Sequence, residues 1–344
     1  MSTAEISQPV PVRRARRAAA RLIPTGIYGW IAGRLLLCVF TLVVVSLLIF
    51  AATTILPGDA ARAILGRNVR PEALATLREQ LGLDRPVTAQ YFSWVKGVFT
   101  GDLGESLTAR QPVGSLAVPA AVNTFTLMFI TLVISVPLSI LIGCVSAVRR
   151  DRAFDRVTQV TSLILAAVPE FIIGMVLVIV FATTAFQVFP AVTIIPADER
   201  AYGNLDQMVL PIATLVLMTI PYLALTVRAS VIEALESEYV VMARTKGLSE
   251  RRVVLRHALP NTLAPAFQAI ALTIAWLAGG LVIIEFLFNF PGLGGALQNA
   301  VTTRDLPMIQ VITLILATVV VLSNLLADVL TVLVTPRLRT GRRR

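Results

Sequence analysis

The chain has 344 residues, of which 56% are hydrophobic and only 15% are charged. Soluble domains carry about a quarter charged residues, so this composition excludes an ordinary soluble protein and indicates a membrane protein. The net charge of +10 does not indicate nucleic-acid binding. The basic residues lie between long apolar segments and do not form one basic face with aromatic side chains.

Six segments are apolar and long enough to span a bilayer, which takes about 20 residues. In chain order they are 35–56, 116–148, 157–185, 207–227, 258–284 and 306–327, the last continuing to Val334. Pro137 gives the second segment a place to bend. The sequence therefore predicts an all-α integral membrane protein with six transmembrane helices.

The first span follows a basic stretch, an arrangement also found in secretory signal peptides. Its apolar segment has 22 residues, which is longer than the roughly 7–15 residues of a signal-peptide core. We therefore expect a retained membrane anchor.

The orientation follows from the distribution of Lys and Arg. With the N-terminus inside, 21 of the 30 basic residues lie in inner segments and nine in outer segments. The positive-inside rule then places both termini, the basic tails 1–30 and 336–344, in the cytoplasm. The first outer loop holds seven of the nine outer basic residues, but long loops cross membranes largely regardless of charge.

This first outer loop, residues 57–115, contains two helical patterns. Pro71 and Gly82 lie at the start and just past the end of a helix over 71–83. Residues 87–99 are rich in aromatic side chains, which suit a membrane–water interface. Two interpretations remain open: a pair of helices on the outer leaflet, or a docking platform for an external partner.

The inner segment 228–260 has the pattern of two short helices. Acidic residues begin and basic residues end a helix over 231–246, which complements the helix dipole. Gly247 lies where a C-terminal glycine belongs, and Ser249 can cap a second helix. Pro260 is expected to break that helix at the membrane surface.

Apolar residues distinguish this inner segment from an ordinary solvated loop. They are Tyr239, Val240, Met242, Val253, Val254 and Leu255. A hydrated loop has no need of them, so we expect a protein-docking surface here.

The same segment resembles the "EAA" loop of bacterial ABC importer permeases: Glu-Ala-Ala, three residues, Gly, nine residues, then Ile-x-Leu-Pro. The matching positions are Ala243, Gly247, Leu259 and Pro260, whereas Val241, Met242 and His257 depart from the pattern. The form from Tyr239 to Leu248 is similar to that of the dipeptide/oligopeptide/nickel subfamily. We refer to residues 228–260 as the coupling loop.

Further stretches share this resemblance, which runs from about residue 33 to residue 337. They include 48–59, 81–91, 101–106, 283–294, 304–305, Asp328 and 335–337. The long outer loop is similar to that of the first of the two unlike permeases in such systems. The implied organisation is a first helix with its outer loop over 31–115, followed by a five-helix permease core over 116–335.

The resemblance implies a type I ABC importer permease fold in the bacterial cytoplasmic membrane, with cytoplasmic coupling helices. The residues that would engage an ATPase are Tyr239, Ala243, Arg244, Lys246, Gly247, Leu248, Leu259 and Pro260. The implied partners are a second homologous permease, two ABC ATPase subunits, an extracytoplasmic binding protein and membrane lipid, with no nucleic acid.

The chain has no Gly-x-x-x-x-Gly-Lys-Ser/Thr pattern, so we expect it not to be an enzyme and to bind no cofactor itself. ATP and Mg²⁺ would be bound by the partner ATPases. Cys38 and Cys144 lie in apolar segments and the single His257 has no suitably spaced ligands, so neither a disulfide nor a metal site is expected.

Glu170 lies inside the third span, directly after Pro169. An ionisable residue within a span is a candidate functional residue. It could line the pore and meet a ligand amine or a cation, or it could make a polar contact with the partner permease. Glu285 and Asp328 lie nearer the two membrane surfaces and are expected to be structural.

The ligand is expected to be a di- or oligopeptide. Nickel chelates, glutathione and other small solutes remain alternatives. A secondary transporter is a different class, disfavoured because the coupling loop has no second copy and intramembrane acids are few. An intramembrane enzyme would need a nucleophile-and-base or metal cluster, which the sequence does not supply.

The charge distribution predicts an accessible outer loop and a shielded coupling loop. In intact cells, an impermeant thiol reagent should label Thr100→Cys and should not label Ser249→Cys. Labelling of Ser249→Cys from outside would contradict the proposed orientation.

Overall fold

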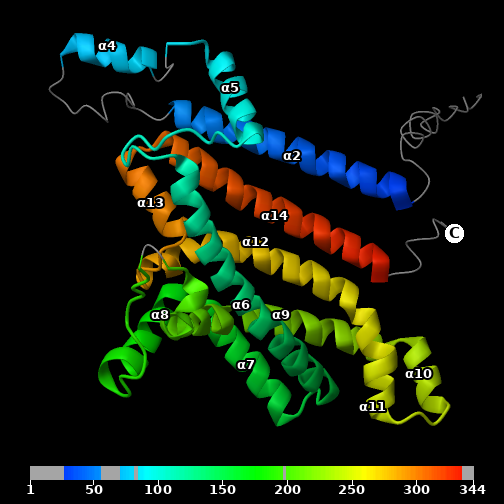
Figure 1. Cartoon of the computed structure of the whole chain (residues 1–344). Coiled ribbons are helices and arrows are strands. Elements are labelled where there is room, and N and C mark those ends of the chain that lie inside the picture. Colours follow the sequence, from blue (N-terminus) through cyan, green and yellow to red (C-terminus); the bar gives the residue numbers. More distant parts are fainter. Residues whose placement is uncertain (1–26, 56–69, 81–83, 197–198, 335–344) are drawn as a thin grey trace, which may run out of the picture.

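The computed structural model describes residues 27–55, 70–80, 84–196 and 199–334, and in these ranges the regular structure is helical (Figure 1). Five helices are long and apolar enough to cross a membrane: α2 (Ile27–Ile55), α6 (Val113–Val148), α9 (Val209–Glu236), α12 (Leu263–Leu287) and α14 (Leu306–Val334). A bent pair of helices passes the same test of length and apolarity when its two halves are taken together as a sixth span. The predicted all-α fold with six transmembrane segments is confirmed.

The bent pair forms the third span. α7 (Ala153–Ala167) is followed by α8 (Glu170–Val178), which continues as the π-helical η1 (Ile179–Thr184), and the two halves meet at 99°. Val168 has an extended backbone, because a following proline disfavours the helical region. The expectation of a single continuous helix over 157–185 is therefore wrong, and Glu170 begins a new helix at the bend.

The first outer loop contains the two expected helices, α4 (Pro71–Gln80) and α5 (Val87–Thr100). α5 packs against α2: the ring of Tyr91 lies 5.4 Å from that of Phe50, and the Tyr91 and Ser46 hydroxyls are 2.9 Å apart. The aromatic side chains of α5 therefore hold this part of the outer loop against the first span.

Two short connections between spans also contain helices. η2 (Ala201–Gly203) and η3 (Leu205–Met208) precede α9, and α13 (Leu293–Thr303) lies between α12 and α14. The sequence predicts only a gap over 286–305. Hydropathy does not reveal α13, because this helix is only 11 residues long.

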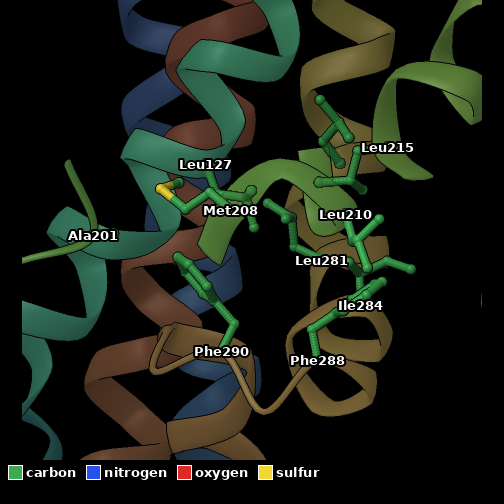
Figure 2. Close-up of a cluster of buried hydrophobic side chains, with 10 residues drawn as sticks. Leu127, Ala201, Met208, Leu210, Leu215, Leu281, Ile284, Phe288 and Phe290 are labelled. Carbon is green, nitrogen blue, oxygen red and sulfur yellow. The ribbon is translucent and has the colours of Figure 1, made fainter. Parts of the chain in front are cut away.

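The central contact of the fold is α6 against α9. Gly143 lies so close to Ala224 and Val227 of α9 that a side chain there would collide with them. Figure 2 shows the adjoining apolar cluster, in which Leu127 of α6 and Met208 face residues of α9, α12 and the loop after it. This packing fixes the three helices as one unit.

A buried carboxylate organises the end of this unit that carries α13. Glu285 is only 1% exposed. It accepts hydrogen bonds from the Thr124 hydroxyl at 2.6 Å and from the backbone amides of Gly294 at 2.6 Å and Gly295 at 3.3 Å. A carboxylate at a helix N-terminus satisfies otherwise unpaired amides. The expected structural role of Glu285 agrees with these contacts.

The coupling loop lies at the opposite end of the molecule, together with the start of α2 and the end of α14 (Figure 1). Arg34 near the start of α2 pairs with Asp328 near the end of α14 at 3.0 Å. Figure 1 shows the ends of these two helices on the same side as α10 and α11. This agrees with the structural role expected for Asp328 and with six crossings.

Several sequence predictions lie outside the described residues. These are the end of the motif at 48–59, the motif at 335–337, the start of 81–91, the C-terminal tail and residues 1–26 of the N-terminal tail. Residues 27–30, which the sequence assigns to that tail, begin α2.

The Glu285 cluster generates a stability prediction. Glu285→Ala leaves the two glycine amides and the Thr124 hydroxyl without their acceptor, at a cost of about 1–3 kcal/mol for each buried unsatisfied group. The melting temperature in detergent should fall clearly. Glu236→Ala, which removes an exposed ion pair with Arg150, is the control and should change it little.

Candidate coupling surface and ligand path

The coupling loop is built from α10 (Glu238–Thr245) and α11 (Glu250–Val253). α9 ends at Glu236, and Ser237 has an extended backbone with φ −71° and ψ 149°. The continuous helix predicted over 231–246 is therefore wrong: its first part belongs to α9. The Ser237 hydroxyl donates to the Ala234 carbonyl, a local bond that competes with helix continuation.

Gly247 separates the two loop helices as predicted. Its φ is +76°, in the left-handed region, and its amide donates to the Arg244 carbonyl at 2.9 Å. A side chain at Gly247 would meet nothing within 4 Å, so the need for glycine is conformational. Ser249 precedes α11 with an extended backbone but makes no side-chain capping bond, so that part of the prediction is wrong.

The second helix does not end at Pro260. α11 runs through the π-helical η4 (Val254–Ala258) and the 3₁₀-helical η5 (Leu259–Thr262) directly into α12. Leu259 is half-buried and Pro260 is exposed within η5. The proline interrupts regular α-helix without stopping the helical path, so the loop is connected to α12 by nearly continuous helix.

The two loop helices enclose a small apolar core. Val240, Ala243 and Val253 are buried, with Leu235 and Leu248 packed against them. Ala243, expected from the sequence to contact a partner, is only 6% exposed and lies inside the loop. Val240 and Val253 are also expected on the surface, and this expectation is wrong for the same reason.

Arg244 also acts within the loop. Its guanidinium Nε donates to the Glu250 carboxylate at 2.7 Å, and a second guanidinium nitrogen reaches the Leu235 carbonyl at 3.4 Å. These bonds connect α10 with α11 and with the end of α9. Lys246, at the end of α10, is exposed.

Four large apolar residues of the loop are exposed. Tyr239, Val241 and Met242 of α10 are 44%, 50% and 59% exposed, and Leu255 is 53% exposed. The loop's own core does not use them. We call these four residues the coupling surface, because large exposed apolar side chains of this kind mark sites of contact with another protein.

A buried ion pair supports the base of the loop. Arg228 of α9 binds Asp155 of α7 through two bonds, of 2.6 and 2.8 Å, and Asp155 is fully buried. Asp155 also accepts bonds from the Ser146 hydroxyl of α6 at 2.5 Å and from the Asp151 amide at 3.0 Å. Three helices thus meet at one carboxylate. In the sequence these charges indicate only the orientation of the chain.

Glu170 lies apart from the coupling loop, at the bend of the third span. Its carboxylate faces α12: a Cβ atom at Gly280 would lie 3.5 Å from Glu170 Oε1. A cavity of about 310 Å³ lies between α9 and α12, lined by Met218, Thr219, Tyr222, Leu272, Thr273 and Trp276. The structure therefore places Glu170 close to the helix that forms one wall of this cavity.

Away from the coupling loop, at the end of the molecule that carries α13, two stretches named in the resemblance come together. Asp305 accepts bonds from the Ser106 hydroxyl, the Thr108 hydroxyl at 3.0 Å and the Leu107 amide at 3.2 Å. The stretch around 101–106 is thereby held against the start of α14.

Comparison with known proteins agrees with this architecture. Residues 139–340 match the family described as "binding-protein-dependent transport system inner membrane component", and residues 27–138 match its N-terminal counterpart. The chain belongs to this family and has its type I ABC importer permease fold. The family expected from the sequence is confirmed.

Two groups of relatives align over nearly their whole length. A putative peptide transport system permease protein of Brucella abortus is 35% identical over 298 residues, covering 87% of this chain and 95% of the relative. The glutathione transport system permease protein GsiC of Salmonella choleraesuis is 33% identical over 311 residues, covering 90% and 99%.

The ion pair at the base of the loop can be tested directly. Asp155→Asn leaves the largely buried Arg228 without its counter-charge and should destabilise the protein by about 3 kcal/mol, measured by unfolding in detergent micelles. Asp328→Asn, at the more exposed pair with Arg34, should cost about 1 kcal/mol or less. Equal effects would contradict the structural importance assigned to Asp155.

Proposed function

We propose that this chain forms half of the translocation pore of an ATP-driven importer of di- or oligopeptides. A second homologous permease would supply the other half, two ABC ATPases the energy, and an extracytoplasmic binding protein the ligand. The single observation that carries the proposal is the coupling loop, a prefolded helix pair that exposes large apolar side chains outside its own small core.

The position of the loop suits force transmission. α10 follows the end of α9 after one extended residue, and α11 leads by nearly continuous helix into α12. A partner that moves the loop therefore moves two spans together. The Asp155–Arg228 pair extends the connection to α6 and α7, which favours rigid-body motion of the helix bundle.

The sequence supports an energy source on partner subunits. The chain has no phosphate-binding glycine loop, so ATP and Mg²⁺ would be bound by the partner ATPases. An apolar helix surface fits a groove on such a partner, as in other helix-in-groove contacts. Tyr239 and Met242 would enter the groove, and Lys246 would lie at its edge.

The orientation proposed for the bacterial cytoplasmic membrane places both termini and the coupling loop in the cytoplasm. It is supported by the excess of basic residues on that side and by the position of the start of α2 and the end of α14, which lie on the same side as the loop (Figure 1). ATPases reside where ATP is available, so the two assignments agree.

A peptide ligand is favoured by the names of the relatives, which include peptide transport permeases. The match to a glutathione permease supports glutathione as a second candidate. Both ligands carry a free amino group and amide bonds, so one pore chemistry suits both.

The coupling loop generates a prediction about Gly247. Gly247→Val forces a β-branched residue into the left-handed region, which costs roughly 1–3 kcal/mol locally. Because the spans hold their own backbone bonds, the variant should reach the membrane in normal amount. We expect it to lose ATPase co-purification or ligand-stimulated ATP hydrolysis by at least about tenfold.

The matched control is Gly101→Val. Gly101 has φ +81° and, as at Gly247, a side chain added there would meet no atom within 4 Å. Unlike Gly247, it lies at the end of α5, in the first outer loop and away from the coupling loop. It should retain ATPase association. Met242→Glu tests the surface without backbone strain and should weaken association. Normal coupling in both Gly247→Val and Met242→Glu would refute the proposed role of the loop.

A further inference from the structure

Glu170 differs from the other acidic residues buried within the helix bundle. Asp155, Glu285 and Asp305 each accept several hydrogen bonds. Within the described part of the chain, no hydrogen bond or ion pair is assigned to the half-buried Glu170 carboxylate. A carboxylate at membrane depth needs a donor or a cation, so Glu170 is suited to receive one from outside this chain.

The cavity between α9 and α12 is apolar inside. Met218, Tyr222, Leu272 and Trp276 contribute its large side chains. The two threonine hydroxyls that line it bond back to their own helices, Thr219 to the Leu215 carbonyl and Thr273 to the Ala269 carbonyl. The cavity therefore has aromatic and aliphatic walls and no free hydroxyl donor from these two threonines.

The cavity and the carboxylate share one face of α12. Trp276 lines the cavity, and Gly280, which lies against Glu170, follows one helical turn later. Residues four apart lie on the same helix face, separated by about 6 Å along the axis. α12 runs from the coupling loop toward α13 (Figure 1), so a ligand arriving from the α13 side meets Glu170 before the cavity.

We propose that Glu170 and the α9–α12 cavity together bind the N-terminal residue of a peptide: its free ammonium group at Glu170, and its apolar or aromatic side chain in the cavity. This inference rests on the proposed peptide-import function and specifies the ligand chemistry within it. An ammonium group supplies the charge-assisted hydrogen bonds that the carboxylate lacks. The rings of Trp276 and Tyr222 favour an aromatic side chain or a nearby cation.

The size of the cavity limits what it can hold. A volume of about 310 Å³ is at the lower end of small-molecule sites, which span about 300–1,000 Å³. It is large enough for one apolar or aromatic side chain, and it is open to one side, since Tyr222, Leu272 and Trp276 are 48%, 54% and 43% exposed. The rest of the peptide would extend through this open side, so the proposed site selects the first residue and places no limit on peptide length.

Gly280 and Gly279 provide a matched pair of variants. A side chain at Gly280 grows toward the Glu170 carboxylate, whereas a Cβ atom at Gly279 has nothing within 4 Å. Gly280→Leu therefore covers the carboxylate, and Gly279→Leu adds the same side chain next to it without doing so. Neither substitution changes the charge of the protein.

The test uses the complete importer in proteoliposomes, with radiolabelled tripeptides that begin with Phe or with Gly. Glu170→Gln and Gly280→Leu should each reduce uptake of both peptides about tenfold, the effect of losing one charge-assisted hydrogen bond. Gly279→Leu should stay within about twofold of the wild type. Trp276→Ala should reduce uptake of the Phe peptide more than that of the Gly peptide.

The outcomes separate this inference from the proposed function. Wild-type uptake of peptide with unchanged uptake in Glu170→Gln and Gly280→Leu overturns the site and leaves the function standing. If the wild-type importer takes up neither peptide, the peptide function itself fails. If Glu170→Gln alone does not assemble with the partner permease, the peptide uptake of Gly280→Leu tests the site in its place. If both lose the partner permease, the carboxylate serves subunit contact and the inference is overturned.

Discussion

The bilayer supplies no water to the hydrogen-bonding groups within it, and the rest of the structure depends on this constraint. The spans are helices, and several hydroxyls within them, such as those of Thr131 and Thr214, bond to their own backbone. Where regular helix is interrupted near the Glu285 cluster, side-chain oxygens accept hydrogen bonds from backbone amides that have no partner within a helix. Under this constraint an acid without such partners, as Glu170 is among the described residues, is the natural place for a ligand cation.

Much of the fold could be predicted from the sequence because hydropathy and the glycine at 247 are local signals. The six crossings, α5 and the left-handed turn at Gly247 agree with expectation. The size of the bend at Pro169 could not be predicted, because a proline alone permits anything from a slight kink to a sharp turn. α13 was missed because it is short and lies between two spans.

The candidate site was predicted less completely, because its key contacts join residues far apart in the chain. The loop pattern identified Tyr239 and Met242 correctly as exposed, but it could not tell that Ala243 packs against Val253. Likewise Asp155 and Arg228 are 73 positions apart, and their separate charges gave no sign of pairing. The approach of Glu170 to Gly280 of α12 depends on the size of the bend at Pro169, which the sequence does not give.

The small core of the coupling loop has a consequence for the transport cycle. A segment that became ordered only on contact with its partner would lose conformational entropy at every engagement, which weakens binding. Here α10 and α11 already hold each other through Val240, Ala243 and Val253 and through the Arg244–Glu250 pair. The loop can therefore move as a rigid body, so that a displacement of the partner is passed to the spans, and a displacement of the spans to the partner, without folding or unfolding of the loop.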